Sequence, residues 1–106
     1  MSETEQKILM MISSAGESKA KAFEALRKVK ESKYEEARAL LKEAQQIDLD
    51  AHKVQTEMIT AELNGGENKP EMSLLMVHAQ DHYMTSQLAR DLIEELINVF
   101  EEKERR

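Results

Sequence analysis

The fold is decided by residues 70–103, PEMSLLMVHAQDHYMTSQLARDLIEELINVFEEK. On a helix that turns by about 100° per residue, this stretch carries two apolar stripes. The first stripe consists of Leu75, Met76, Ala79, Tyr83, Ile93, Ile97 and Phe100. The second stripe consists of Leu74, Val77, Met84, Leu88, Leu92 and Val99. A helix that packs against two others needs one wide stripe, so the second stripe predicts a further contact, most simply with copies of the same helix.

Two amphipathic helices precede this one, and we expect them over approximately residues 3–30 and 33–64. Their apolar side chains recur at steps of three and four residues, as in helices that bury one face. The first face consists of Ile8, Met11, Ile12, Ala15, Ala22, Leu26 and Val29, and the second of Ala37, Leu40, Leu41, Ala44, Ile47, Ala51, Met58 and Ile59. Asp48 and Gln55 fall on or near the second face, where buried polar groups need hydrogen-bond partners.

Local signals indicate where the helices begin. Ser2 and Glu5 have the spacing of a capping box, and Ser32 and Glu35 repeat that spacing. Pro70 suits the first position of a helix, because the N–H that proline lacks would have no partner there. We therefore expect the third helix to run from about Pro70 to near Lys103.

The links between the helices are short, which makes sequential helices antiparallel neighbours. Asn64, Gly65 and Gly66 end the second helix, because these residue types tolerate the left-handed conformation that stops helices. With 106 residues the chain has room for one domain. Residues 1–106 are therefore expected to form a single all-α domain, an antiparallel three-helix bundle.

The composition excludes several classes of function. The chain has no cysteine, which rules out a disulfide framework, a thiolate zinc site and a cysteine nucleophile. Its net charge of −6 disfavours nucleic acids and anionic membranes as partners. The first residues are acidic and no long apolar run follows them. We therefore expect no signal peptide, no membrane-spanning helix and a cytoplasmic location.

His78 lies between the two stripes of the third helix, so we expect it to be partly exposed in a groove where helices or subunits meet. A neutral imidazole is already nucleophilic toward phosphorus, and phosphoryl transfer needs little more than positioning and charge stabilisation. A purely structural histidine is the alternative. His78 and His82 at positions i and i+4 could also bind a transition metal, although no His-Glu-x-x-His sequence is present. For His52 we expect a structural role.

Asp81 occupies a core position of the second stripe, where Val77, Asp81, Met84 and Leu88 follow the 4-3-4 steps of a coiled-coil seam. In a rotationally symmetric oligomer the copies of Asp81 would converge near the axis and repel one another. A cation could bridge them, and oxygen ligands favour a hard ion such as magnesium. The alternative is that Asp81 faces solvent and pairs with a neighbouring basic residue.

The run SLLMVHAQDHYMT at residues 73–85 resembles the signature of the lactose/cellobiose-type enzyme IIA proteins of the sugar phosphotransferase system. Two further stretches are similar to the same family in the same order, ISSAGE at residues 12–17 and AHKVQTE at residues 51–57. Tyr83 departs from the leucine expected at its position. The resemblance spans nearly the whole chain.

The resemblance implies a homotrimer that assembles through the third helix. His78 matches the histidine that is phosphorylated at Nε2, and Gln80 matches a motif residue beside it. The phosphoryl group would come from the phosphocarrier HPr and pass to the cysteine of the cognate enzyme IIB, which serves the membrane component IIC during uptake of a lactose-, cellobiose- or chitobiose-type sugar. Asp81 matches the aspartate that holds one magnesium ion per trimer on the axis.

Two other functions are compatible with an exposed histidine on a helix. A histidine phosphotransfer domain of two-component signalling usually has a lysine three residues after its histidine, and here that residue is Asp81. A non-catalytic coiled-coil scaffold would make His78 incidental. Loss of every transfer activity in a His78→Ala variant would separate the phosphocarrier from the scaffold.

Overall fold

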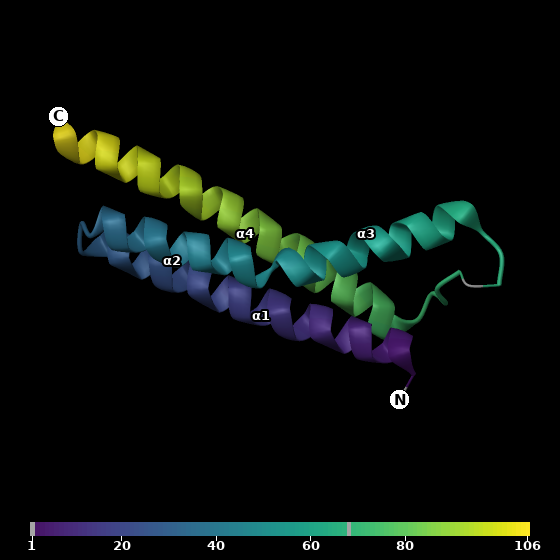
Figure 1. Cartoon of the computed structure of the whole chain (residues 1–106). Helices are drawn as coiled ribbons and strands as arrows, with labels where there is room; N and C mark the ends of the chain where they lie inside the picture. Colours follow the sequence, from purple (N-terminus) through teal and green to yellow (C-terminus); the bar gives the residue numbers. More distant parts are fainter. Residues whose placement is uncertain (1, 68) are drawn as a thin grey trace.

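The computed structural model describes residues 2–67 and 69–106, and this part of the chain contains helices and no strands. The helices are α1 (Glu3–Lys30), α2 (Tyr34–Ile47), α3 (Leu49–Asn64) and α4 (Leu74–Arg105). Helices α2 and α3 together run back along α1, and α4 then returns in the direction of α1 (Figure 1). The bundle measures 59 × 24 × 20 Å. The predicted all-α bundle of antiparallel sequential neighbours is confirmed.

The middle helix is interrupted, whereas the sequence predicts one continuous helix over residues 33–64. Asp48 adopts φ −84° and ψ −2° in a turn between α2 and α3. Its carboxylate is buried and pairs with Arg90 of α4, so a contact with a distant segment accompanies the break. Figure 1 shows α3 diverging from α1 toward its C-terminal end.

The predicted start of the third helix and the predicted cap of the second helix are wrong. Helix α4 begins at Leu74 rather than at Pro70, and Ser73 is its N-cap. The Ser73 hydroxyl accepts a hydrogen bond from the Met76 backbone N–H at 3.1 Å, which satisfies an amide that the helix itself cannot satisfy. Ser32 has a φ of 59° and lies in the link before α2, so it does not cap that helix. The capping box formed by Ser2 at the start of α1 is confirmed.

We expect the Ser73→Ala variant to lose about 1 kcal/mol of unfolding free energy, because the Met76 amide loses its acceptor. Urea unfolding followed by far-UV circular dichroism at one protein concentration measures this loss. The matched control is Ser13→Ala, which removes an exposed serine inside α1. Alanine is the better helix former there, so the control should be neutral or slightly stabilising. Equal losses in both variants would contradict the capping role.

The core has two apolar clusters separated by a layer of buried polar side chains. One cluster is formed by Ile8, Met11, Ala15, Ala51, Val54, Met58, Met76, Ala79 and Tyr83. The other is formed by Ala22, Ala25, Val29, Ala37, Leu41, Ala44, Ile93 and Ile97. Ser18, Asp48 and Ser86 are buried between them, and the Ser18 hydroxyl donates to the Ala44 carbonyl at 2.7 Å. The polar layer lies at the level of the break between α2 and α3.

The two stripes of α4 have the different environments that their pattern predicts. The first stripe faces the core, except for Phe100, which is exposed. Every member of the second stripe is exposed, including Val77 at 50%, Met84 at 53% and Leu88 at 59%. The single chain therefore leaves an apolar face of α4 open along most of the helix. Among the described residues, no helix is long and apolar enough to cross a membrane.

Candidate functional site

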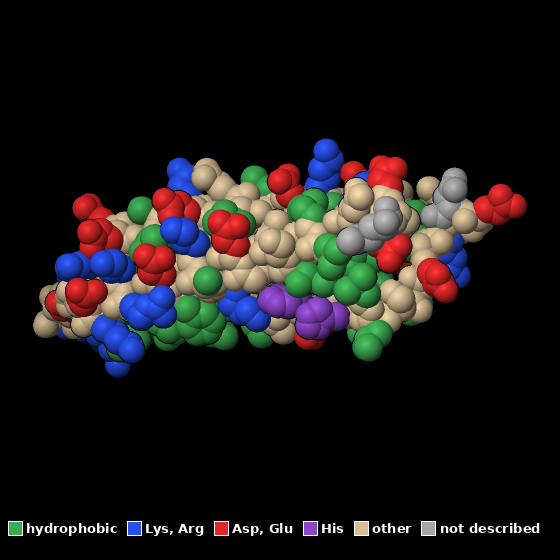
Figure 2. Space-filling view, turned by 90° about the horizontal axis from the view of Figure 1, so that it is seen from below, with side chains coloured by type: hydrophobic (Ala, Val, Ile, Leu, Met, Phe, Trp, Pro, Cys, Tyr) green, Lys and Arg blue, Asp and Glu red, His purple; other side chains and the backbone are tan. Residues whose placement is uncertain are grey.

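His78 lies in the second turn of α4 and its side chain is exposed, as the sequence predicts. The Ser73 cap fixes the start of the helix, and His78 follows the buried Met76 and precedes the buried Ala79. The ring centroid of His78 is 5.4 Å from that of His82, and the two rings meet edge to face at 82°. Figure 2 shows histidine side chains on the surface beside a group of hydrophobic side chains.

His82 is half-buried against α1. A Cβ atom built on Gly16 would lie 3.7 Å from Cε1 of His82, so the imidazole packs on the α1 backbone at the position of this glycine. Nδ1 of His82 is enclosed without a hydrogen-bond partner among the described residues. Gly16 and His82 thus bring the stretch at residues 12–17 into contact with the stretch at residues 73–85.

The stretch at residues 51–57 reaches the same part of α4 through two hydrogen bonds. Nε2 of Gln55 donates to Oε1 of Gln80 at 2.9 Å, so both amides have the partners that their positions require. Nδ1 of His52 and the Tyr83 hydroxyl are 2.8 Å apart, so this side chain joins α3 to α4, and its structural role stays a prediction. The three stretches singled out in the sequence therefore converge around the first turns of α4.

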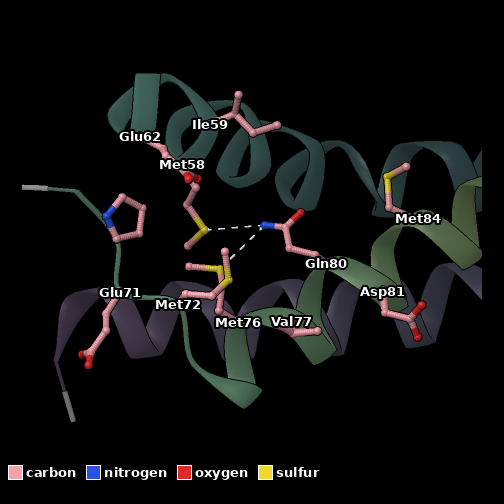
Figure 3. Close-up of a pocket in the computed structure, with 11 residues that line it drawn as sticks. Met58, Ile59, Glu62, Glu71, Met72, Met76, Val77, Gln80, Asp81 and Met84 are labelled. Carbon is pink, nitrogen blue, oxygen red and sulfur yellow. Dashed lines mark hydrogen bonds between the residues drawn. The ribbon is translucent and has the colours of Figure 1, made fainter. Parts of the chain in front are cut away.

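A groove with a volume of about 390 Å³ lies between the end of α3 and the start of α4. Met58, Met76 and Met84 line its wall, and Asp81 and Val77 lie beside them. Figure 3 shows the Gln80 amide nitrogen pointing at the sulfur atoms of Met58 and Met76, at 4.0 and 3.7 Å. In the same view the Asp81 carboxylate points away from the Gln80 amide.

Within the described part of one chain, no three His, Cys, Asp or Glu side chains are grouped closely enough to bind a metal ion. Asp81 is exposed on the same face of α4 as Val77 and Met84. The structure therefore brings His78 and His82 together, but it leaves Asp81 as a single carboxylate on an open apolar face. Any magnesium site at Asp81 would need carboxylates from other copies of the chain.

Residues 6–101 match the family model described as "PTS system, Lactose/Cellobiose specific IIA subunit". The chain belongs to this family. It is a IIA component of a sugar phosphotransferase system and acts as a phosphocarrier.

Known IIA components are similar to this chain over almost its full length. It is 40% identical over 99 residues to the N,N'-diacetylchitobiose-specific EIIA component of Escherichia coli K12, covering 93% of this chain and 84% of the relative. It is 43% identical to the lichenan-specific IIA component of Bacillus subtilis, with coverages of 93% and 88%.

Solved structures of IIA proteins agree with the fold. The cellobiose-specific enzyme IIA from Bacillus anthracis has a TM-score of 0.90 and 34% identity, covering 100% of this chain and 95% of that protein. The IIA(chitobiose) structure of Escherichia coli, solved as a complex with HPr, has a TM-score of 0.81 and 36% identity. The coverages in that comparison are 98% of this chain and 99% of the other.

The IIA chain also contains a buried ion pair between Asp48 and Arg90, which the sequence alone did not predict. Asp48 is 1% exposed, and its Oδ2 accepts a hydrogen bond from Nη2 of Arg90 at 2.8 Å. Burial raises the pKa of the Asp48 carboxyl, and the charge of Arg90 opposes that rise. Asp48 was expected to need a partner, but no local spacing connects it to a residue 42 positions later. Burial also raises the pKa of Tyr83, which lies about two turns of α4 before Arg90, and the charge of Asp48 raises it further.

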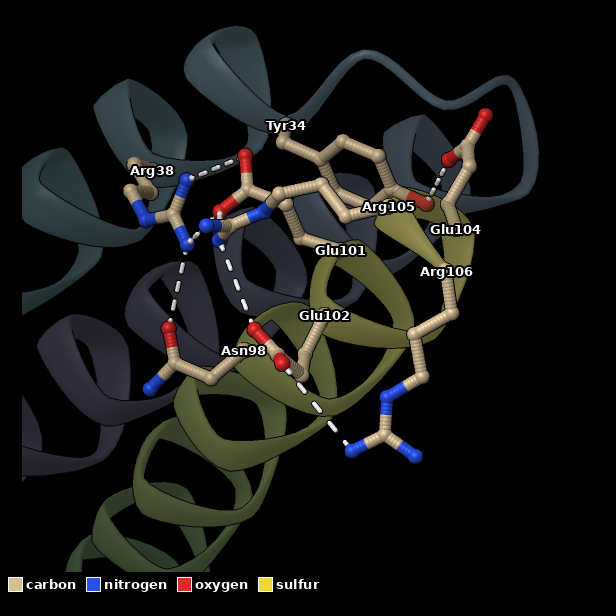
Figure 4. Close-up of polar contacts among 8 residues, drawn as sticks. All are labelled: Tyr34, Arg38, Asn98, Glu101, Glu102, Glu104, Arg105 and Arg106. Carbon is tan, nitrogen blue, oxygen red and sulfur yellow. Dashed lines mark hydrogen bonds and ion pairs between the residues drawn. The ribbon is translucent and has the colours of Figure 1, made fainter.

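At the end of the bundle that contains the start of α2 and the C-terminal turns of α4, polar contacts join these two helices (Figure 4). The Arg38 guanidinium donates to the Glu101 carboxylate at 2.8 and 3.2 Å and to Oδ1 of Asn98 at 3.0 Å. These hydrogen bonds lower the pKa of the Glu101 carboxyl. The Tyr34 hydroxyl donates to the Glu104 carboxylate. Arg38 and Glu101 lie near the end of α4 opposite to His78, so we assign this cluster to the docking of α2 on α4.

Proposed function

We propose that His78 accepts a phosphoryl group from phospho-HPr and passes it to the cysteine of a cognate enzyme IIB. The supporting observation is the exposed imidazole of His78 at the point where the three family stretches converge. The HPr complex of the similar IIA(chitobiose) protein supports HPr as the donor. The sequence relatives favour uptake of a lactose-, cellobiose- or chitobiose-type sugar through a membrane component IIC, with the IIA subunit in the cytoplasm.

The first transfer is an in-line displacement at phosphorus. The lone pair of His78 Nε2 forms an N–P bond while the bond between phosphorus and the HPr imidazole breaks, and its electron pair stays on the HPr nitrogen. In the second transfer the IIB thiolate forms an S–P bond, and the electron pair of the broken N–P bond returns to His78 Nε2. The exposure of His78 supports both steps, because each partner must reach the same nitrogen.

The open apolar face of α4 supports a homotrimer. Val77, Met84 and Leu88 are each at least half exposed in the single chain, and burial between three copies would remove this apolar surface from water. In such a trimer the three Asp81 carboxylates would meet near the axis. Their oxygen atoms suit magnesium, which would neutralise the repulsion between them.

The decisive experiment is incubation of the protein with enzyme I, HPr and phosphoenolpyruvate, followed by intact mass spectrometry. We expect one acid-labile phosphoryl group per chain in the wild type and none in the His78→Ala variant. His52→Ala is the matched control, because His52 is also on a helix but bonds to Tyr83, and it should be phosphorylated like the wild type. An unmodified wild-type mass under conditions that phosphorylate HPr would contradict the proposal. Transfer from phosphorylated IIA to a receiver-domain aspartate, and not to a IIB cysteine, would favour a two-component function instead.

A further inference from the structure

We propose that Asn64 converts spontaneously to isoaspartate, because the backbone nitrogen of Gly65 attacks the side-chain amide of Asn64. The sequence marks these two residues only as the end of the second helix. The structure adds that the junction between them is exposed and that the attacking nitrogen is weakly held. The inference is independent of phosphoryl transfer at His78, and it assigns a modification site to the end of α3.

The reaction consumes water and needs no other reagent. The Gly65 nitrogen loses its proton and forms a bond with the side-chain carbonyl carbon of Asn64. The bond from that carbon to the side-chain NH₂ group breaks, and the NH₂ group takes up the proton and leaves as ammonia. Water then opens the resulting succinimide ring at one of its two carbonyls. One opening gives aspartate at position 64, and the other gives isoaspartate, in which the main chain runs through the side-chain carbons and gains a methylene.

The junction between Asn64 and Gly65 is open to solvent on all sides that the structure describes. Asn64 is the last residue of α3, and Gly65 follows it with a φ of 70°. Residues 62–67 are all exposed, including Leu63 at 82%. Gly65 has no Cβ, and nothing among the described residues lies within 4 Å of the place where a Cβ would be. Neither a side chain nor tertiary packing therefore blocks the approach of the Asn64 carbonyl carbon to the Gly65 nitrogen.

The hydrogen bonds of the Gly65 N–H control the rate of the attack. This N–H is shared between the carbonyls of Ala61 and Glu62, each at 3.2 Å. These distances are at the long end of the usual range, and shared hydrogen bonds of this kind are common at helix ends. While the last turn of α3 is closed, the two carbonyls hold the Gly65 nitrogen away from the Asn64 side chain. Because the turn is exposed, few contacts oppose its opening, and each opening frees the nitrogen.

The modification adds negative charge where α3 cannot compensate for it. The C-terminal end of a helix is its negative pole, and the last turn of α3 has no basic residue. The product is one unit more negative than the unmodified chain with its charge of −6. Met58, Ile59 and Glu62 of α3 line the groove between α3 and α4. We therefore expect the modification to loosen the last turn of α3 and, through it, one wall of this groove.

The test follows the full-length protein by mass spectrometry during incubation in ¹⁸O-labelled water at mildly alkaline pH. We expect the wild type to release ammonia and to take up one oxygen from the labelled water. Cleavage after glutamate releases residues 63–67, which contain Asn64 as their only asparagine, and this peptide should carry the change. An isoaspartyl methyltransferase should methylate the isoaspartate form of the peptide and not the aspartate form. The same chain unfolded in urea gives the rate without the helix. Because a fraying helix end opens at little cost in free energy, the folded protein should react within about tenfold of that rate.

Asn98 is the control within the same chain. It is also exposed, but the β-branched Val99 follows it, and its Oδ1 accepts a hydrogen bond from Nη2 of Arg38 at 3.0 Å. The peptide of residues 96–101 should therefore stay unmodified. The Asn64→Gln variant keeps a side-chain amide but would need a larger ring, so it should not react at position 64. The inference would be overturned if the folded protein kept Asn64 intact while the unfolded chain reacted. Equal modification of Asn98, or a mass change that persists in Asn64→Gln, would overturn it as well.

Discussion

Replacement of Arg90 by methionine is expected to lower the free energy of unfolding by about 3–5 kcal/mol, the usual loss when one partner of a buried ion pair is removed. The Asp48 carboxylate is 1% exposed and the Arg90 side chain is 11% exposed, so water cannot easily replace the lost guanidinium. Methionine preserves most of the side-chain length and its apolar packing. The loss therefore comes mainly from an uncompensated buried charge.

Urea unfolding at one protein concentration measures this effect, with two variants as controls. Arg105→Met removes an arginine whose side chain is 69% exposed and whose ion pairs lie on the surface, so it should change the stability by less than about 1 kcal/mol. The double substitution Asp48→Leu with Arg90→Met removes both charges and should recover most of the loss. The proposed buried ion pair at the turn between α2 and α3 would be contradicted by an Arg90→Met variant with the stability of the wild type. It would also be contradicted by a double variant that is as unstable as Arg90→Met alone.

The pH dependence of Arg90→Met should show that the charge of Asp48 causes the loss. Burial raises the pKa of the Asp48 carboxyl in the folded state, so the folded protein binds this proton more tightly than the unfolded chain does. The stabilisation that comes from protonating the Asp48 carboxyl is therefore fully present below its pKa in the unfolded chain, about 4. It is lost as the pH rises through the pKa of Asp48 in the folded protein. In Arg90→Met the pKa of Asp48 in the folded protein should rise further, because the charge of Arg90 no longer opposes the effect of burial. The stability gap between the variant and the wild type should therefore narrow as the pH falls toward 4.

The three helical segments of the bundle, with α2 and α3 as the middle one, could be predicted from the sequence because their apolar residues recur at helical spacing. The break at Asp48 could not be predicted in this way, since no glycine or proline marks it and α2 and α3 continue the same apolar face. The partner of Asp48 lies 42 residues later on α4. A contact between segments so far apart leaves no local pattern, so periodicity alone cannot detect the turn that accompanies it.

The start of α4 shows a competition between two local signals. Pro70 is compatible with a first helical position, but Ser73 offers a hydroxyl that satisfies the Met76 amide, and the helix begins after Ser73. The exposure of His78 was predicted because it lies between two apolar stripes. The packing of His82 on Gly16 was not predicted, because it depends on how two helices lie against each other.

The Asp81→Leu variant is expected to remain trimeric and to associate more tightly than the metal-free wild type. In the proposed trimer the substitution removes three like charges from the axis and adds apolar surface beside Val77 and Met84, both about half exposed in the single chain. Replacing buried charges by apolar residues commonly stabilises an assembly by about 1–4 kcal/mol. Sedimentation equilibrium over a range of protein concentrations measures the change. The matched control is Asp50→Leu, which removes an exposed carboxylate from α3 rather than from α4 and should leave the association unchanged.

Removal of magnesium separates the effect of charge from that of apolar packing in this variant. If the ion bridges the three Asp81 carboxylates, a chelator exposes their mutual repulsion, and the wild-type trimer should dissociate at higher protein concentrations than before. Asp81→Leu has no carboxylate at this position, so the chelator should not affect its association. The opposite substitution on the same face, Leu88→Asp, replaces a 59% exposed leucine by a charge and should weaken the trimer with or without the ion. A monomeric Asp81→Leu protein would place Asp81 away from the axis, because removal of a repelled charge cannot dissociate the assembly that it opposes.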